Sequence, residues 1–448
     1  MCRMRFLHSG PCLAVVCFAV FGAHQPGTTP ADEPAPSVPR DKLGAATVEY
    51  QTQLLAKLIP ESEAIKATAA FDPVVFAAYV PKDNALTPER VALGRKLYFD
   101  KRLSADGTIS CATCHDVTRG FTDQLPVSEG IGKQFGKRNA PTTLNAALLQ
   151  TMFWDGRSPS LDHQARLPIL NPVEMGMPDE ATALKAISGD AEYQDAFQKA
   201  FGRKINYEDL GLAMGAFERT LVFLDSPFRK FLASDEKAIS AQARAGWELF
   251  NGKARCMTCH PMNPSNPLGT DNRFHNIGVS ARHQDFEALA QRAVKALGAD
   301  GSEQKLDELA VGTNLSELGR FMVTHNRPDI GSFRTPLILN IAITPPYMHD
   351  GSLATLWDVI DHYNKGGEAN LFLDGGVEPL ALTEAEIDQL VAFLFTLTDV
   401  RFADENQRQF ERQRAAAKKH RPVRDEALAS RRTLPFERQV TGSKNTNQ

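Results

Sequence analysis

Two copies of one five-residue pattern carry the clearest chemistry in this sequence. Cys111-Ala-Thr-Cys114-His115 and Cys256-Met-Thr-Cys259-His260 both follow the order C-x-x-C-H, which is the signature for covalent attachment of a c-type haem. The two thiols add across the vinyl groups of one porphyrin, and the histidine supplies the proximal nitrogen of the iron. A zinc site would need four ligands, and a redox dithiol would need a βαβ context that this sequence does not predict. We therefore predict two covalently bound haems.

The first 23 residues have the features of an export signal. Arg3 and Arg5 precede an apolar run over residues 13–23, and this run is too short to span a bilayer. Residues 24–84 are expected to form a linker and an N-terminal helical segment. Three of the seven cysteines lie in the export signal and four in the haem motifs, so none is left for a disulfide. Because c-type haem is attached outside the cytoplasm, we predict a periplasmic protein without a transmembrane anchor.

The overall composition is that of a soluble globular protein, with 42% hydrophobic and 23% charged residues. The net charge is −4, but residues 401–448 carry 12 Lys/Arg against 6 Asp/Glu. This basic tail could dock a partner, or it could form a solvated helix or a strap over the acidic surface of its own chain. No basic pattern interleaved with aromatic residues is present, so nucleic acid is not an expected partner.

Each haem motif needs a helix before it and a helix after it to hold the cofactor. Thr87-Pro88-Glu89 predicts a helix start before the first motif, and Ser240 predicts one before the second. Gly94-Arg-Lys-Leu97 matches Gly246-Trp-Glu-Leu249, which indicates a weak internal repeat. Apolar residues at helical spacing predict a closing helix in each half. In the first half they are Leu210, Ala213, Met214, Phe217 and Leu221. In the second half a capping box at Thr383-Glu-Ala-Glu386 begins the helix, which ends near Thr398 and carries Ile387, Leu390, Val391, Leu394 and Leu397.

These elements predict an all-α fold of two cytochrome c-like domains with long loops between the helices. The first domain is expected over residues 85–235 and the second over residues 236–400, each with one covalent haem. Residues 285–316 are rich in Ala, Leu and charge and are expected to form an inserted helical segment, whereas 401–448 form the basic tail. The long segment 135–177 is dense in Trp, Phe, Gly, Pro and Asn, which is typical of a functional loop.

Several further motifs give the sequence a recognisable resemblance. They are Leu93-Gly-Arg-Lys-Leu-Tyr-Phe-Asp100, Phe153-Trp-Asp-Gly-Arg157, Asn171-Pro-Val-Glu-Met175 and Pro345-Pro-Tyr-Met-His-Asp-Gly351. In this order and spacing, the chain resembles the bacterial di-haem cytochrome c peroxidases and their MauG-type relatives over roughly residues 85–398. The resemblance implies that the first haem is the site of reaction with hydrogen peroxide and that the second haem is an electron-transfer site.

For the first haem, the resemblance places the peroxide-reactive iron on His115. In ordinary peroxidases of the family a histidine can block this iron until the enzyme is reduced, but the matching residue here is Ile131. The iron is therefore expected to stay open, as in the MauG-type branch. Glu174 and Gln164 match the distal-pocket residues of the family. Peroxide cleavage needs a group that takes a proton from one oxygen and returns it to the other, and Glu174 is the candidate.

For the second haem, the resemblance places His260 as the proximal ligand and Tyr363 as the distal ligand, where ordinary peroxidases have Met. An anionic phenolate lowers the reduction potential of the iron and favours its high-valent form. From the residues alone, His362 or Met348 could take this place instead. His349 is expected to form a hydrogen bond near the second haem.

Two further sites are implied only by the resemblance. Trp154 matches the tryptophan that relays oxidising equivalents between the two haems. A calcium ion is expected between the haems, held by the side chain of Asn139 and the backbone carbonyls of Thr344 and Pro346. A coordination shell of a few protein oxygens and several water molecules is a reasonable environment for this hard cation.

Three functional hypotheses follow. The first is MauG-like use of hydrogen peroxide to oxidise Trp or Tyr side chains of a partner protein. The second is detoxification of hydrogen peroxide with a small cytochrome c or a cupredoxin as electron donor. The third is a di-haem electron carrier without catalysis, which Glu174 and an unblocked first haem argue against. Ile131 and Tyr363 favour the first hypothesis, and the protein is expected to be a monomer or a homodimer.

Overall fold

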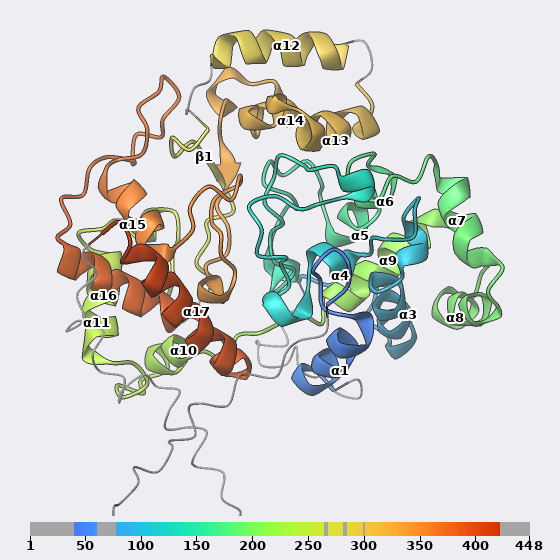
Figure 1. Cartoon of the computed structure of the whole chain (residues 1–448), viewed down its shortest axis with the longest axis horizontal. Helices are drawn as coiled ribbons and strands as arrows, with labels where there is room; N and C mark the ends of the chain where they lie inside the picture. The colour runs from blue at the N-terminus through green and yellow to red at the C-terminus, as the bar shows by residue number, and fades with distance from the viewer. Residues whose placement is uncertain (1–39, 61–77, 264–267, 281–284, 299–300, 422–448) are drawn as a thin grey trace, which may run out of the picture. The chain divides into compact units, whose positions relative to one another are not determined.

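The structure, a computed structural model, describes residues 40–60, 78–263, 268–280, 285–298 and 301–421. The predicted export signal 1–23, most of the linker, and the tail beyond residue 421 lie outside the described residues. Within the described part the chain is helix-rich (Figure 1). Its strands are β1 (Phe274–His275) and β2 (Phe333–Arg334), which pair antiparallel with Phe274 opposite Arg334. No helix in these described ranges is long and apolar enough to cross a membrane.

The first half of the molecule, which corresponds to the predicted first domain (residues 85–235), is built on two helices. They are α3 (Pro88–Tyr98) and α9 (Tyr207–Glu218), which pack against each other and lie side by side in Figure 1. Thr87 caps α3 by accepting a hydrogen bond from the Arg90 N–H at 3.3 Å, as the sequence predicts. The two helices cross at Gly94, where an added Cβ would lie 1.8 Å from the carbonyl oxygen of Ala213. Only glycine permits this close approach of the two backbones.

The second half, which corresponds to the predicted second domain (residues 236–400), repeats this arrangement with α11 (Ala241–Asn251) packed against α16 (Glu384–Phe395). Ser240 caps α11, and the predicted capping box begins α16 with its acidic member at Glu386. Here the crossing point is Gly246, where an added Cβ would lie 1.9 Å from the carbonyl oxygen of Gln389. The structure therefore confirms the internal repeat. Helix α16 ends at Phe395 rather than near Thr398, because the chain turns away once Thr396 serves as its C-cap.

The remaining elements surround these helix pairs, and most of them are short, apart from α12 and α17. The α-helices are α1 (Val48–Leu58), α4 (Cys111–Cys114), α5 (Leu161–Gln164), α6 (Leu167–Leu170), α7 (Glu180–Ser188), α8 (Ala191–Phe201), α10 (Pro227–Leu232), α12 (Phe286–Gly298), α13 (Glu303–Gly312), α14 (Phe321–Thr324), α15 (Leu356–Asn364) and α17 (Ala403–Ala417). The 3₁₀ helices are η3 (Lys101–Leu103), η4 (Val117–Arg119), η5 (Ile131–Lys133), η6 (Ala146–Leu148), η7 (Cys256–Thr258), η8 (Asn314–Leu318), η9 (Arg327–Asp329), η10 (Ile341–Ile343) and η11 (Val400–Phe402). The predicted loop 135–177 is mostly irregular, as expected.

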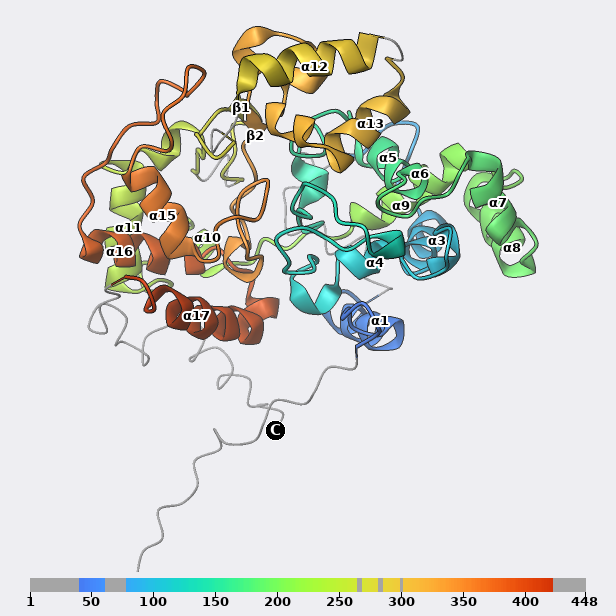
Figure 2. The ribbon, with the colours of Figure 1, turned by 45° about the horizontal axis from the view of Figure 1, so that its top comes forward.

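The segment 285–316 forms helices α12 and α13, as its composition predicts. Helix α13 packs on the first half, where it contacts α6 (Figure 2). The backbone N–H of Lys137 donates to the carbonyl of Val311 at 2.9 Å, and His163 Nε2 lies 2.5 Å from Glu303 Oε1. The segment inserted into the second half therefore covers part of the first half.

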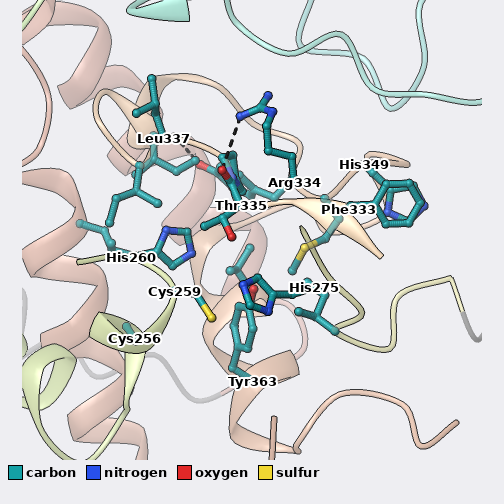
Figure 3. A pocket seen from close by; sticks show the side chains of 18 of the residues that line it. Cys256, Cys259, His260, His275, Phe333, Arg334, Thr335, Leu337, His349 and Tyr363 are labelled. Carbon is teal, nitrogen blue, oxygen red and sulfur yellow. Dashed lines mark hydrogen bonds between the residues drawn. The ribbon is translucent and has the colours of Figure 1, made fainter. Parts of the chain in front are cut away.

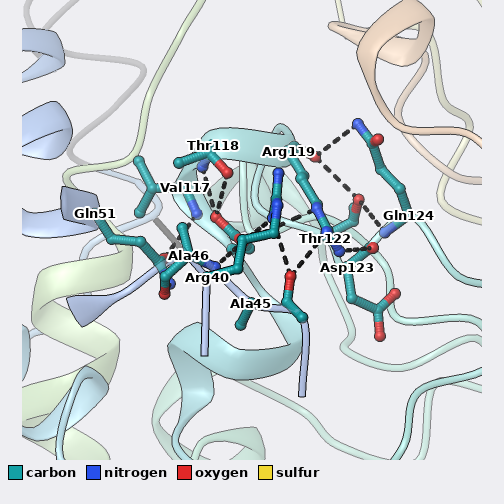
Figure 4. A network of polar contacts seen from close by, with 12 residues as sticks. Arg40, Ala45, Ala46, Gln51, Val117, Thr118, Arg119, Thr122, Asp123 and Gln124 are labelled. Carbon is teal, nitrogen blue, oxygen red and sulfur yellow. Dashed lines mark hydrogen bonds and ion pairs between the residues drawn. The ribbon is translucent and has the colours of Figure 1, made fainter. Parts of the chain in front are cut away.

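The segments before and after the two halves pack on them through buried polar side chains. The carboxylate of Asp116, directly after the first haem motif, is fully buried and accepts the N–H of Ala46 at 2.8 Å. Gln51 of α1 accepts the N–H of Val117 at 2.9 Å within the same network (Figure 4). At the other end, buried Gln413 of α17 accepts from Tyr347 Oη at 3.2 Å. The described part of the tail is therefore a helix that straps onto its own chain.

Candidate functional site

The first haem motif presents its histidine in a defined orientation. The two cysteines lie on α4, and His115 follows as its C-cap. The Nδ1 atom of His115 lies 3.4 Å from the carbonyl oxygen of Phe121, and the Tyr98 hydroxyl donates to the His115 carbonyl at 2.9 Å. Burial lowers the pKa of His115 to about 4, so the ring is neutral. With Nδ1–H directed to a carbonyl, the lone pair of Nε2 is available to a metal.

The second haem motif has the same arrangement. Its cysteines lie on and directly after η7, and His260 Nδ1 lies 2.8 Å from the carbonyl oxygen of Gly269. Burial lowers the pKa of His260 as well. The acceptor residues are alike in conformation, because Phe121 and Gly269 both have positive φ, at 58° and 67°. The four cysteines of the two motifs are free thiols, so the residues of both motifs fit covalent haem attachment.

A large and mostly apolar cavity adjoins the second motif (Figure 3). Cys256, Cys259 and His260 line one part of it, and Tyr363 reaches into it from α15. Burial raises the pKa of Tyr363 well above its ordinary value, so the phenol needs a positive partner such as a ferric iron to ionise here. Mostly apolar walls with a proximal histidine and a small number of polar side chains are suited to a haem.

The alternative ligands for the second haem differ in their surroundings. His362 is buried, and its Nε2 lies 2.8 Å from the carbonyl oxygen of Ile277. This hydrogen bond engages the nitrogen that would otherwise reach a metal. Met348 lines the same cavity as Tyr363. The geometry therefore favours Tyr363 over His362, and the assignment of the ligand stays a prediction.

His349 lies at the wall of the same cavity and has polar partners. Its Nε2 lies 3.2 Å from Ser280 Oγ and 3.3 Å from Glu317 Oε2, and its ring stacks on Phe333 with 3.8 Å between centroids. The stacking and the two oxygens hold the imidazole in one orientation, as expected for a residue that forms hydrogen bonds near a cofactor.

His275 is a residue of this cavity that the sequence analysis missed. A hydrogen bond with Cys259 and the carboxylates of Asp374 and Asp271 raise its pKa to about 10, with Nδ1 2.6 Å from Asp374 and Nε2 2.9 Å from Asp271. Ligand atoms of Cys259, Asp271 and His275 lie within 4.8 Å of one another. These three residues are a possible metal site only while Cys259 is a thiol, because haem attachment turns its sulfur into a thioether.

Trp154 lies at the contact between the two halves. Its Nε1 donates to the carbonyl of Asn139 at 2.9 Å, and its own carbonyl accepts the N–H of Arg334 from β2 at 2.8 Å. It lines the cavity beside the second motif. The indole is therefore held by the first half and the backbone of the same residue by the second, and the relay role of Trp154 stays a prediction.

The predicted calcium ligands come together at the same cavity. Asn139, Thr344 and Pro346 all line it. The side-chain amide nitrogen of Asn139 donates to the carbonyls of Leu125 and Pro126, at 2.9 and 3.3 Å, which leaves the amide oxygen for another partner. A set of neutral oxygens near Trp154 fits a hard cation whose remaining coordination positions are filled by water. The calcium site stays a prediction.

Glu174 lies in the turn that follows α6. Its backbone carbonyl accepts the N–H of Ile131 at 3.0 Å, so the residue at the position of the blocking histidine packs on the Glu174 turn. The Oε2 atom of Glu174 is buried and has no hydrogen-bond partner among the described residues. Burial and the charge of Asp307 raise the pKa of Glu174 to about 8, against the opposing effect of Arg157. A carboxyl group with a buried, unpaired oxygen is suited to proton exchange with a bound substrate.

Gln164 is the last residue of α5, where its backbone N–H donates to the Ser160 carbonyl at 2.9 Å. Its role in the distal pocket stays a prediction. The sequence analysis missed Asp307 and Arg157, which are both buried and act on Glu174. Arg157 could have been found because it closes the Phe153–Arg157 motif, whereas Asp307 lies among many other charges of the insert.

The comparisons with known proteins agree with this geometry. The family described as di-haem cytochrome c peroxidase matches residues 88–237. A relative named methylamine utilization protein MauG, from Methylorubrum extorquens, is 39% identical over 321 residues, which is 71% of this chain and 80% of the relative. The chain belongs to the di-haem cytochrome c peroxidase and MauG family.

Other members of the family extend the comparison. The cytochrome c551 peroxidase of Pseudomonas aeruginosa is 32% identical over 361 residues, which is 80% of this chain and 91% of the relative. A solved structure, described as a MauG-like protein associated with microbial copper homeostasis, is 32% identical, covers 71% of this chain and 92% of its own, and has a TM-score of 0.60. Membership implies haem as the cofactor, and the chain is an oxidoreductase that acts on peroxide.

Proposed function

We propose that this protein is a periplasmic di-haem peroxidase that uses hydrogen peroxide to oxidise Trp or Tyr side chains of a partner protein. The observation that carries the proposal is that Tyr363 reaches into the cavity of the second motif while His362 is engaged by the Ile277 carbonyl. A phenolate ligand suits the holding of an oxidising equivalent, whereas a Met ligand suits rapid electron delivery. The similarity to MauG supports the same proposal.

The two haems belong to two cytochrome c-like domains, residues 85–235 and 236–400. When bound, the first haem supplies the iron at which the O–O bond of peroxide is cleaved, and the second stores oxidising equivalents. Cys111, Cys114 and His115 hold the first haem, and Cys256, Cys259, His260 and Tyr363 hold the second. The duplicated packing at Gly94 and Gly246 supports this division.

Glu174 is the proton-transfer group in this proposal. Its carboxylate takes a proton from the near oxygen of peroxide and returns it to the far oxygen, which leaves as water. Because burial raises its pKa to about 8, the group can both accept and release a proton near neutral pH. Gln164 donates a hydrogen bond to the bound peroxide. Ile131 has no ring nitrogen that could bind the iron, so prior reduction is not required.

Trp154 connects the two sites. Its indole N–H donates to the carbonyl of Asn139 and its backbone carbonyl accepts the N–H of Arg334, which fixes the residue at the contact between the halves. In this proposal Trp154 relays electrons from the second site to the first. Calcium bound by Asn139, Thr344 and Pro346 would hold the same contact rigid. The protein acts in the periplasm, as its N-terminal sequence predicts, on a redox or substrate protein.

The test is to supply the protein with hydrogen peroxide and a candidate substrate, namely an exported protein encoded by a neighbouring gene. Mass spectrometry should find new oxygen or a new cross-link on Trp or Tyr side chains of that protein. Slow turnover with reduced cytochrome c is expected in a parallel assay. Rapid turnover with cytochrome c and an unmodified partner would instead establish detoxification.

A further inference from the structure

One carboxylate of the inserted segment is buried in the first half of the molecule. Asp307 lies on α13 and is 3% exposed. The helix is held there by the bond from Lys137 to Val311, and a Cβ added at Gly312 would lie 3.5 Å from Val173 Cγ2. An isolated buried carboxylate is costly, so the groups that compensate its charge show what it does.

Asp307 uses its two oxygens on two different segments. Its Oδ1 accepts hydrogen bonds from Arg157, with Nε at 2.9 Å and an Nη atom at 2.8 Å. Its Oδ2 accepts the side-chain amide nitrogen of Asn171 at 2.6 Å. Arg157 closes the loop that carries Trp154, and Asn171 begins the turn that carries Glu174. A single side chain of the insert therefore joins the two loops with proposed catalytic residues.

The bond to Asn171 determines how the turn around Glu174 is held. An ionised carboxylate only accepts hydrogen bonds, so it binds the NH₂ end of the Asn171 amide. The amide oxygen then faces the N–H of Val173, at 3.0 Å. The backbone carbonyl of the same asparagine accepts the N–H groups of Glu174 and Gly176, at 3.2 and 2.8 Å. Asn171 thus organises the turn, and Asp307 selects the orientation of its amide.

Arg157 brings a positive charge next to the carboxylate of Asp307. Its side chain is 4% exposed, and its guanidinium lies 3.1 Å from Asp155 and stacks on the ring of Phe153 at 3.5 Å. The charged groups that act on Glu174 are Asp307 and Arg157, which oppose each other, and burial adds to the effect of Asp307. Arg157 is in turn paired with Asp155, and Arg138 lies 3.8 Å from the same carboxylate.

We propose that Asp307 is a positioning residue of the peroxide site, which orients Asn171 and balances Arg157 so that the carboxyl group of Glu174 is held in place for proton exchange. The proposal rests on the proposed acid–base role of Glu174. It assigns the inserted segment a part in the reaction of the other half of the molecule, since the segment supplies the carboxylate from outside the first domain.

The test is an infrared titration of the diferric holoprotein, following the carbonyl stretch of protonated carboxyl groups with pH. The band that is missing in E174Q belongs to Glu174. In D307N this band should disappear at lower pH than in the wild type, with the acid dissociation constant increased roughly tenfold or more. In R157Q the band should persist to higher pH. The matched control is E303Q, which removes the other acidic link between α13 and the first half and should leave the titration unchanged.

The outcomes separate the two proposals. An unchanged titration in D307N, with E174Q lacking the band, overturns the role of Asp307. Should D307N fail to fold, R157Q still decides, because a band that persists to higher pH supports the charge balance and an unchanged one contradicts it. The rate of the peroxide reaction in E174Q tests the function of Glu174 separately. A near-normal rate there would refute the acid–base role while the infrared titration still reports the effect of Asp307.

Discussion

The two halves of the molecule hold their histidines in the same way and differ in what faces them. In each half a glycine, Gly94 or Gly246, lets two helices cross closely, and the histidine donates Nδ1–H to the carbonyl of a residue with positive φ. The first half then presents the carboxyl group of Glu174, whose Oε2 atom is buried and has no hydrogen-bond partner among the described residues. The second presents Tyr363 at a large apolar cavity. The duplicated scaffold therefore supplies the attachment motif in both halves, whereas the proposed difference in chemistry comes from the loops that face it.

The largest expected effect comes from removing one haem at a time. Replacing Cys111 and Cys114 by Ser should abolish the peroxide reaction, because the iron that meets peroxide is lost. Replacing Cys256 and Cys259 by Ser should leave a peroxide-reactive haem that cannot pass oxidising equivalents to a partner. Haem content per chain and stopped-flow absorbance would measure both. Equal loss of the peroxide reaction in both variants would contradict the unequal roles.

Glu174→Gln should slow the peroxide step by about 10²–10⁴, because the amide keeps the shape but cannot take up a proton. Stopped-flow kinetics at varied peroxide concentration would measure the rate. Glu303→Gln, an exposed acidic residue of α13, is the control and should keep the wild-type rate. The assignment fails if both variants react equally fast.

The pH dependence of the peroxide step should report the same group. Because burial and Asp307 raise the pKa of Glu174 to about 8, the proton-accepting form is lost as pH falls below this value. The rate should be level above pH 8 and fall roughly tenfold per pH unit below it. Glu174→Gln should remove this slope. A profile that is flat between pH 5 and 8 in the wild type would show that another group transfers the proton.

Tyr363→Met should raise the reduction potential of the second haem by roughly a hundred millivolts or more, because a neutral thioether replaces an anionic phenolate. A redox titration followed by absorbance would measure it. Tyr347→Phe is the matched control, since it removes another buried phenol of the cavity wall, whose oxygen donates to Gln413. An equal potential in Tyr363→Met and the wild type would exclude Tyr363 as the ligand.

The smallest effect concerns the shared scaffold. Gly94→Ala and Gly246→Ala should each lower the free energy of unfolding by about 1–3 kcal/mol, because the added methyl group meets a carbonyl oxygen of the facing helix. Gly189→Ala, where nothing lies within 4 Å of the added Cβ, is the control. Thermal unfolding would measure all three. A much larger cost in one half would show that the two crossings are not equivalent.

Much of this architecture could be predicted because it depends on local signals. The haem motifs, the caps at Thr87 and Ser240, and the capping box before α16 are short patterns with a direct physical meaning. The repeat around Gly94 and Gly246 was visible as four-residue matches, and the structure confirms it as two equivalent crossings.

The rest depended on contacts between segments far apart in the sequence. Asp307 lies 150 residues from Arg157 and 136 from Asn171, and its helix carries other acidic residues with the same local pattern. The pairing of His275 with Asp374 spans 99 residues. No periodicity identifies which charge of a surface helix becomes buried, so these partners needed the tertiary structure.

The inequality of the two haem sites is tested most directly by electron paramagnetic resonance of the diferric protein before and after addition of hydrogen peroxide, without prior reduction. We expect a high-spin signal from an open first haem and a low-spin signal from a Tyr363-ligated second haem, both lost within the dead time of mixing and freezing. Tyr363→Phe should alter only the low-spin signal before peroxide is added. Two low-spin signals that persist until an electron is supplied would show that the first haem is closed and that the two sites are not unequal in this way.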